Sequence, residues 1–169
     1  ASDPIPFAVG GGGNMGANHI RVYNALSEAE LVGVVEPDPE RAQEIADEYG
    51  VPVVDQVNEL EGARAATVAV PNRLHREVAE ECAAMGLDLL VEKPLALSIE
   101  GAKAIVAAAT EHDVLLQVGH IERFNPAVQT LNEILETKEV YAIEAHRLGP
   151  FSDHLNDESV VFDLMIHDI

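Results

Sequence analysis

The sequence is poor in basic residues, has a single cysteine and contains no long apolar run. Its 169 residues include ten lysines and arginines against thirty aspartates and glutamates, for a net charge of −20. Such a surface repels nucleic acid and anionic membranes, so we expect neither as a partner. No apolar stretch approaches the ~20 residues of a membrane span, and the first residues show no leader pattern. With Cys82 alone, an internal disulfide framework is excluded, and a cytoplasmic protein is expected.

The surplus of acidic residues is spread along the chain rather than gathered in a tail. Apolar residues make up 47% of the sequence, which is enough to bury a core. The acids therefore belong to a folded surface and not to a disordered segment. This composition is typical of a halophilic protein, because the Debye length falls to ~3 Å at 1 M salt and self-repulsion is screened. An ordinary acidic protein is the alternative. Cys82, followed by Ala83, Ala84 and Met85, is expected to be a buried structural thiol.

Short apolar strands alternate with amphipathic helices over the first 120 residues. The expected strands are residues 7–10, 31–35, 51–54, 66–70, 87–91 and 114–118. The expected helices are residues 15–26, 40–49, 75–85 and a helix capped by Ser98 that reaches Glu111; Gly50 and Gly86 end the second and third. Alternation with almost continuously apolar strands predicts an α/β fold, a doubly wound parallel sheet with helices on both faces.

A glycine-rich loop lies between the first strand and the first helix. Residues 11–16, Gly-Gly-Gly-Asn-Met-Gly, fit the pattern G-x-G-x-x-G in the place where a dinucleotide-binding βαβ unit carries it. Gly11 permits the tight turn, Gly13 leaves the backbone open to a pyrophosphate, and Gly16 lets the helix pack on the strand. Backbone N–H groups around Asn14 and Met15, with the positive end of the helix dipole, would hold the phosphates without a lysine.

The second expected strand ends in an acidic residue, Glu36, about 20 residues after Gly16. A carboxylate at this position binds the ribose hydroxyls of a dinucleotide and disfavours the 2′-phosphate of NADP. We therefore predict a Rossmann dinucleotide-binding domain over residues 1–120, with NAD preferred over NADP. The alternative is that Glu36 is one more surface acid and the glycines form a flexible turn.

Two groups of residues are candidates for catalysis. Lys93, in Glu92-Lys93-Pro94, directly follows a strand, and ligands of open α/β sheets lie beyond the carboxyl ends of the strands. A solvated loop lysine paired with Glu92 is the alternative; Pro94 keeps Lys93 out of helical geometry and allows a cis bond. Asp163 and His167 stand four apart, so in a helix over residues 160–169 the carboxylate could orient the imidazole as a base. A helix-stabilising acid and a structural histidine are the alternative there.

Several motifs then follow one another in the order of one family. They are the glycine loop, Val70-Pro71-Asn72 with His75, Glu92-Lys93-Pro94, residues 119–126 (Gly-His-Ile-Glu-Arg-Phe-Asn-Pro) and Asp163-Leu164-Met165-Ile166-His167. Together they resemble the Gfo/Idh/MocA family, named after glucose–fructose oxidoreductase and inositol dehydrogenase, and the resemblance spans the whole chain. Within the family, residues 119–126 and 147–151 are most similar to UDP-N-acetylglucosamine 3-dehydrogenase-like members.

The resemblance implies an activity and roles for particular residues. Lys93, Asp163 and His167 match the family's catalytic lysine, aspartate and histidine. Asn72 and His75 match positions near the nicotinamide and the substrate, and Glu92 with Lys93 is expected at the cofactor. The implied reaction oxidises a secondary alcohol of a sugar, sugar nucleotide or cyclitol and passes hydride to the nicotinamide. Whether Lys93 or His167 takes the proton stays open.

After Gly119 the pattern changes to a helix at residues 126–135, a strand at 140–146, a polar loop at 148–157 and an apolar stretch at 160–169. One helix and one strand cannot bury each other well. Members of the resembled family continue into an open-faced sheet that forms the substrate floor and often a dimer interface. We therefore expect residues 121–169 to be the incomplete start of an α+β substrate and oligomerisation domain, in a truncated chain whose full-length form is a homo-oligomer.

Two other classes of protein were weighed. A metal enzyme is disfavoured because none of the seven histidines shows His-x-His or His-x-x-x-His spacing. A non-catalytic NAD-binding module, such as a redox sensor, would keep the glycine loop and Glu36 and tolerate loss of the substrate domain. Retention of Lys93, Asp163 and His167 argues against it for the parent protein, but not for this chain alone.

Overall fold

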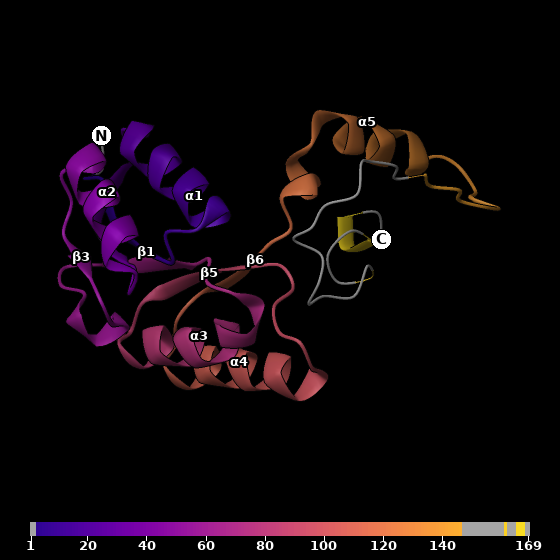
Figure 1. Ribbon diagram of the computed structural model, residues 1–169. Helices are drawn as coiled ribbons and strands as arrows, with labels where there is room; N and C mark the ends of the chain where they lie inside the picture. The colour runs from indigo at the N-terminus through magenta and orange to yellow at the C-terminus, as the bar shows by residue number, and fades with distance from the viewer. Residues whose placement is uncertain (1–2, 147–160, 162–164, 168–169) are drawn as a thin grey trace. The chain divides into compact units, whose positions relative to one another are not determined.

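The computed structural model describes residues 3–146, 161 and 165–167, and the chain divides into two compact units, Ala1–Val118 and Gly119–Ile169 (Figure 1). The first unit is built around a six-stranded sheet. Its strands are β1 (Ile5–Gly10), β2 (Ala29–Val35), β3 (Val53–Val54), β4 (Ala65–Val68), β5 (Asp88–Glu92) and β6 (Leu116–Gly119).

The strands lie in the order β3-β2-β1-β4-β5-β6. Strand β1 runs parallel to β2 and to β4, β2 runs parallel to β3, and β4 runs parallel to β5. This order reverses between β1 and β4, which is the arrangement of doubly wound dinucleotide-binding sheets. The predicted parallel α/β sheet is therefore confirmed.

Four helices cover the two faces of the sheet: α1 (Asn14–Ala25), α2 (Pro39–Tyr49), α3 (His75–Ala84) and α4 (Ile99–Glu111). Helices α1 and α2 lie on one face, and α3 and α4 lie on the other (Figure 1). Their ends follow the expected local signals. Gly50 takes a left-handed conformation with φ 67° after α2, and the Ser98 hydroxyl accepts a hydrogen bond from the Gly101 N–H at 3.0 Å at the start of α4.

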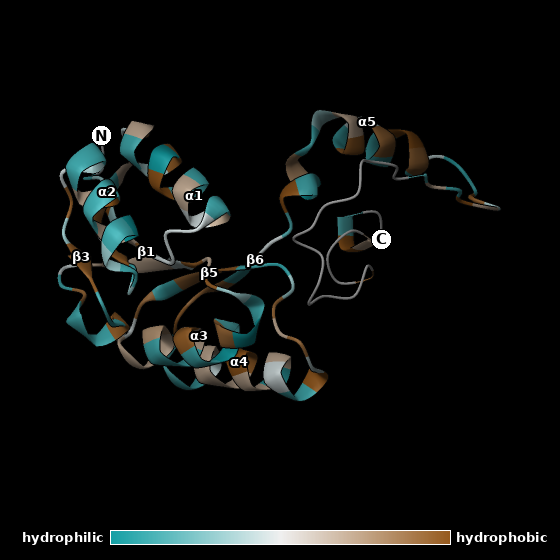
Figure 2. Cartoon of the chain, in the orientation of Figure 1, coloured by the Kyte–Doolittle hydropathy of each residue, from teal (hydrophilic) through white to brown (hydrophobic). Residues whose placement is uncertain are grey.

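The sheet separates two hydrophobic cores. Ala8 and Val9 are neighbours on β1, both fully buried, and they belong to different cores because successive side chains on a strand point to opposite faces. Ala8 packs in the core with Ala79, from α3, and Ile105, from α4, whereas Val9 belongs to the core that includes Ile20 and Ile45, from α1 and α2. In Figure 2, α2 is mostly hydrophilic and the strand β3 is hydrophobic.

The lone cysteine belongs to the first of these cores, on α3. Cys82 is 2% exposed, and this burial, with a smaller contribution from the charge of Glu81, raises the pKa of its thiol to about 12. The thiolate is the reactive form, so the side chain acts as a small apolar group. The expectation of a buried structural thiol is confirmed.

Strand β4 ends at Val68, two residues before the predicted end. The carbonyl of Val70 lies 3.0 Å from a ring nitrogen of His75, beyond the last paired residue of the strand. Pro71, which follows, has no N–H to continue a strand. A short 3₁₀ turn, η2 (Asn72–Leu74), then leads into α3.

The second unit contains the turn η3 (Ile121–Phe124), helix α5 (Pro126–Leu135) and the turn η5 (Met165–His167). The helix has the predicted bounds, and the side chain of Asn125 accepts a hydrogen bond from the Ala127 N–H at 3.0 Å at its start. Among the described residues, no helix is long and apolar enough to span a membrane.

The strand predicted at residues 140–146 is wrong. These residues have no regular secondary structure, and Tyr141 and Ile143 are 87% and 79% exposed. A strand needs a neighbour for its N–H and C=O groups, and residues 120–146 of this unit supply none. The loop expected at residues 148–157, and Asp163, lie outside the described residues.

Candidate cofactor site

The glycine loop begins where the ends of β1 and β4 approach closely. Gly11 has φ 100°, and a Cβ atom on it would lie 2.6 Å from the carbonyl oxygen of Ala69. The Ala69 N–H donates to the Gly10 carbonyl at 2.8 Å, which fixes this approach. Both the backbone conformation and the space therefore require glycine at position 11.

The loop leads directly into the N-terminus of α1. A Cβ atom on Gly16 would collide with the carbonyl oxygen of Gly11, so only glycine lets the helix pack on its own loop. Gly13 is the N-cap, no side chain caps the helix, and its first turn holds no acid. A Cβ atom on Gly13 would meet nothing within 4 Å, and Asn14 and Met15 are exposed. The N-terminus thus has room and free backbone donors for an anion, which fits a dinucleotide pyrophosphate.

The carboxylate of Glu36, just after β2, is held against this loop. Its Oε2 accepts a hydrogen bond from the Gly12 N–H at 2.8 Å, and its Oε1 accepts one from the Asp38 N–H at 2.9 Å. A Cβ atom on Gly12 would lie 2.6 Å from Cδ1 of Ile45 and 2.8 Å from Oε2 of Glu36. The Glu36 carboxylate therefore lies beside the glycine loop, and a side chain at position 12, which the sequence argument did not use, would have to displace the ends of the Ile45 and Glu36 side chains.

Arg41, near the start of α2, was also missed. Its Nε donates to the Gly12 carbonyl at 2.8 Å, and its Nη1 lies 2.7 Å from Oε2 of Glu44. The guanidinium thus braces the loop from the side of α2. The only sequence signal was position, since Arg41 lies five residues after Glu36. In the structure its N–H donates to Oδ1 of Asp38 at 2.8 Å.

Glu92 is the last residue of β5, and Lys93 directly follows it. Glu92 is 8% exposed; its Oε1 lies 2.7 Å from Nε2 of His19, and its Oε2 accepts from the Lys93 N–H at 3.2 Å. Burial alone would raise the pKa of Glu92, but the hydrogen bonds and charges of His19 and Lys93 outweigh it and hold that pKa below its usual value. Glu92 is therefore a carboxylate at neutral pH. The Lys93–Pro94 bond is cis, as the sequence allowed.

His75 joins two loops of the site. It is fully buried, with Nδ1 2.8 Å from the Pro94 carbonyl and Nε2 3.0 Å from the Val70 carbonyl. The ring thereby contacts both the loop after β4 and the loop after β5, and it donates to a carbonyl through each N–H that it carries. In this structure His75 can act on a ligand only through those loops, while Asn72, half-buried at the start of η2, follows the same strand end.

The predicted catalytic residues are distributed over the two units. Lys93 lies in the first unit, directly after β5. His167 lies in the turn η5 of the second unit and is half-buried, whereas Asp163 is outside the described residues. The structure therefore groups Glu36, the glycine loop and the residues after β4 and β5 at the carboxyl edge of one sheet, where α/β proteins bind ligands.

The sequence argument also missed His19, on α1. Gly16, Ile20 and Tyr23 are the buried residues of that helix, and His19 lies on the same side, three residues after Gly16. That spacing was the available signal. One turn further on, the Tyr23 hydroxyl lies 2.6 Å from Oγ1 of Thr67, inside the core.

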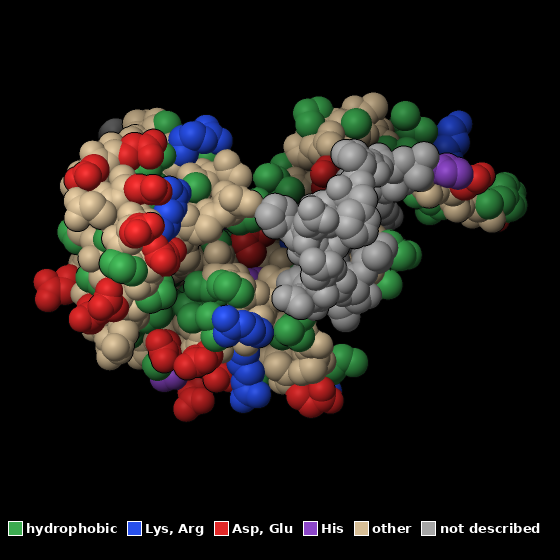
Figure 3. Space-filling model, in the orientation of Figure 1, with side chains coloured by type: hydrophobic (Ala, Val, Ile, Leu, Met, Phe, Trp, Pro, Cys, Tyr) green, Lys and Arg blue, Asp and Glu red, His purple; other side chains and the backbone are tan. Residues whose placement is uncertain are grey.

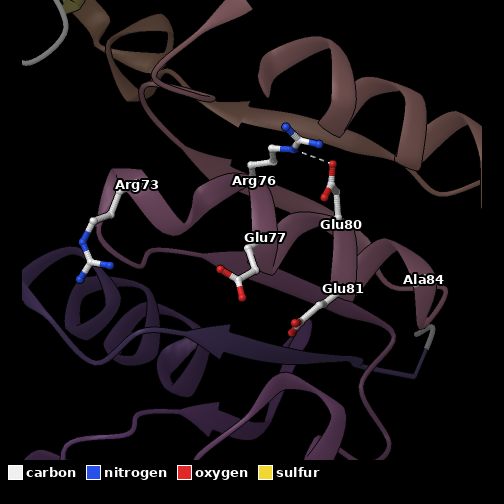
Figure 4. A pocket seen from close by; sticks show the side chains of 6 residues that line it. All are labelled: Arg73, Arg76, Glu77, Glu80, Glu81 and Ala84. Carbon is white, nitrogen blue, oxygen red and sulfur yellow. Dashed lines mark hydrogen bonds and ion pairs between the residues drawn. The ribbon is translucent and has the colours of Figure 1, made fainter. Parts of the chain in front are cut away.

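Other parts of the described chain offer weaker candidates for a site. No group of three or more His, Cys, Asp or Glu side chains among the described residues could hold a metal ion. A shallow hollow follows the outer face of α3 and is lined by Arg73, Arg76, Glu77, Glu80, Glu81 and Ala84 (Figure 4). Its side chains partly satisfy one another, since Arg76 Nε lies 2.9 Å from Oε1 of Glu80, and we assign it no role.

The sheet order, the glycine loop before α1 and the carboxylate after β2 define a dinucleotide-binding domain of the Rossmann type. Residues 5–120 match the description "Oxidoreductase family, NAD-binding Rossmann fold". The chain belongs to this family, Gfo/Idh/MocA.

Named relatives support the same membership. UDP-N-acetylglucosamine 3-dehydrogenase from Acidithiobacillus ferrooxidans is 38% identical over 94% of this chain and 50% of its own length. A solved structure of that enzyme gives a TM-score of 0.88 at 35% identity over 97% of this chain and 54% of the other. Inositol 2-dehydrogenase from Corynebacterium glutamicum is 30% identical over 99% of this chain and 52% of its length.

One further solved relative was determined with its ligands. The WlbA dehydrogenase from Bordetella pertussis, in complex with NADH and UDP-GlcNAcA, gives a TM-score of 0.76 at 29% identity over 80% of this chain and 40% of the other. The chain spans about half the length of the curated relatives it matches.

Proposed function

We propose that this chain is the cofactor-binding part of an NAD-dependent dehydrogenase that oxidises a secondary alcohol of a sugar or a sugar nucleotide. The observation that carries the proposal is the pairing of Glu36 with the glycine loop through the Gly12 N–H. That contact holds the Glu36 carboxylate next to the N-terminus of α1, which supports a site where the carboxylate accepts from ribose hydroxyls and the helix binds phosphates. A carboxylate there repels a 2′-phosphate, so NAD is favoured over NADP.

The residues at the strand ends have distinct roles in this proposal. Bound NAD supplies the hydride acceptor. Lys93, directly after β5, hydrogen-bonds the reacting hydroxyl oxygen. His167 or Lys93 takes the hydroxyl proton, and Asp163 orients His167. The reaction leaves a ketone, because the carbon gives up hydride as its oxygen loses a proton.

The substrate class rests on the relatives. The 38% identical relative is a UDP-N-acetylglucosamine 3-dehydrogenase, and the WlbA dehydrogenase was solved with UDP-GlcNAcA. Inositol 2-dehydrogenases are more distant in identity, so a cyclitol ranks behind a sugar nucleotide. We further propose that residues 121–169 begin the substrate domain and that the complete protein is a cytoplasmic homo-oligomer.

The first test is a calorimetric titration of this chain with NAD and with NADP. Binding of NAD in preference to NADP is expected, and Gly13→Ala should abolish it, because a methyl group would stand where the pyrophosphate approaches the backbone. A folded chain that binds neither dinucleotide contradicts the proposal.

The second test concerns turnover by the complete protein. Lys93→Ala should abolish reduction of NAD by UDP-N-acetylglucosamine while sparing NAD binding. Lys103→Ala, on α4, is the matched control and should retain turnover. Near-normal turnover by the Lys93 variant would remove that residue from the mechanism.

We also propose that the acidic surface is an adaptation to salt. Acidic side chains outnumber basic ones on the face of the first unit seen in Figure 3. Their mutual repulsion is screened at high ionic strength. The free energy of unfolding should rise from dilute buffer to molar salt; a value independent of salt would contradict the adaptation. The titrations above should therefore be run in both conditions.

A further inference from the structure

Helix α1 is attached to the sheet by two polar contacts whose helix residues, Tyr23 and His19, belong to no motif of the sequence analysis. The Tyr23 hydroxyl lies 2.6 Å from Oγ1 of Thr67, on β4, and Nε2 of His19 lies 2.7 Å from Oε1 of Glu92, at the end of β5. The two helix residues are one turn apart. The helix whose N-terminus faces the proposed pyrophosphate site is thus anchored at two neighbouring strands.

The contact at Glu92 continues to the next residue of the chain. Because an ionised carboxylate can only accept hydrogen bonds, Nε2 of His19 must carry the hydrogen of the 2.7 Å contact. The other oxygen of Glu92 accepts from the backbone N–H of Lys93 at 3.2 Å. One carboxylate therefore connects a side chain of α1 to the backbone of Lys93.

This connection is shielded from solvent. The side chains of His19 and Glu92 are 18% and 10% exposed, so water competes weakly for their hydrogen bond. A charge-assisted hydrogen bond in such surroundings is stronger and more directional than one on the open surface.

We propose that His19 is a positioning residue for Lys93: it holds Glu92 in place, and Glu92 fixes the backbone from which the lysine side chain extends. This inference rests on the proposed function, in which Lys93 contacts the reacting oxygen. It adds His19, a residue of α1, to the residues that the proposed reaction requires. The Glu92 carboxylate then fixes the position of Lys93 relative to α1.

Amide hydrogen exchange of the chain without NAD tests the contact itself. We expect His19→Leu to speed exchange of the Lys93 amide about tenfold, because the carboxylate that accepts it is no longer held. His19→Gln, which keeps a side-chain N–H donor, should restore most of the protection. Tyr23→Phe is the matched control: it removes the other anchor of α1 and, with exchange rates compared at equal global stability, should leave the Lys93 amide unchanged. If His19→Leu does not fold, His19→Ala replaces it.

Two results would overturn the inference. One is an unchanged Lys93 amide in the folded His19→Leu variant. The other is equal acceleration in Tyr23→Phe, which would mean that any loosening of α1 has the same effect. Both readings are made without cofactor, so they hold even if the wild-type chain fails to bind NAD and the proposed function falls.

Kinetics of the complete protein test the consequence for catalysis. With NAD and UDP-N-acetylglucosamine, His19→Leu should lower kcat by about tenfold or more while the KM for NAD changes less than about threefold, and His19→Gln should recover most of kcat. A purely structural role would leave kcat per folded enzyme unchanged, and that result would overturn the inference.

Discussion

The backbone N–H of Gly12 donates a hydrogen bond to Oε2 of Glu36 at 2.8 Å, across 24 positions of the sequence. This contact brings the residue after β2 against the phosphate loop. Four consecutive glycines, residues 10–13, occur here, and the last three have different surroundings. Gly11 needs a positive φ, Gly12 has Ile45 and Glu36 against it, and Gly13 faces open space.

Alanine at positions 12 and 13 should therefore change the stability of the fold to different extents. Gly12→Ala should lower the free energy of unfolding by about 1–3 kcal/mol, because its Cβ would lie 2.6 Å from Cδ1 of Ile45. Gly13→Ala should cost no more than about 1 kcal/mol, because its Cβ would meet nothing within 4 Å and only the poorer N-cap preference of alanine is added. Urea unfolding of the two variants checks this, and equal stability of Gly12→Ala and the wild type would contradict the packing described here.

Glu36→Gln should reduce the discrimination between the two dinucleotides. The amide oxygen can still accept from the Gly12 N–H, but the negative charge that repels a 2′-phosphate is gone. We expect the ratio of the NADP and NAD dissociation constants to fall about tenfold, measured by calorimetry. Asp38→Asn, which changes a charge at the N-cap of α2, is the control. An unchanged ratio would mean that Glu36 does not select the cofactor.

The carboxylate of Glu92 should contribute stability that acid removes. Its pKa is lower in the folded state than its usual value, so the contribution is present above the unfolded pKa of about 4.3 and is lost as the pH falls through the folded value. The variant Glu92→Gln lacks this pH-dependent contribution to stability. The difference in free energy of unfolding between the wild type and this variant should therefore shrink on acidification below about pH 4. Curves that stay parallel throughout would contradict the pairing.

The hydrogen bond between Tyr23 and Thr67 should show as a coupling energy. Tyr23 is 9% exposed and Thr67 is fully buried, so Tyr23→Phe leaves the threonine hydroxyl without this partner. We expect a loss of about 1–2 kcal/mol for Tyr23→Phe and for Thr67→Val separately. The double variant should lose less than the sum, as measured by urea unfolding. Strict additivity would show that the contact does not stabilise the fold.

The thiol of Cys82 should react only when the first unit opens. Its pKa is raised to about 12 and it is 2% exposed, so the folded chain holds almost no accessible thiolate at neutral pH. A thiol-specific reagent should label it slowly in native buffer and rapidly in denaturant, with the rate followed by absorbance. Rapid labelling without denaturant would contradict this environment for α3.

Sequence reasoning succeeded where a short segment carries its own instructions. Helix α5 begins and ends at the predicted residues, because Asn125 and Pro126 mark its start. Gly50 and Ser98 likewise end and begin helices through contacts within a few residues. The glycine pattern likewise predicted the tight turn between β1 and α1, where Gly11 has φ 100°.

Long-range contacts were not accessible in that way. His19 and Glu92 are 73 positions apart, so nothing local to either indicated their contact. His75 matched a position near the ligand, yet the structure buries it between two carbonyl groups. Residues 140–146, Val-Tyr-Ala-Ile-Glu-Ala-His, have the apolar character of a strand, but that character is not sufficient where no neighbouring strand completes the hydrogen bonds.

The sheet is also a partition. Ala8 and Val9 are adjacent in the chain, yet each faces a core with its own pair of helices. Substitutions beneath α3 and α4 change packing that lies across the backbone from α1, and energies of separated sites add almost independently. With His75 kept, because its ring contacts the loops after β4 and β5, the packing of α3 and α4 can be redesigned at positions distant from β1 while the glycine loop stays as it is.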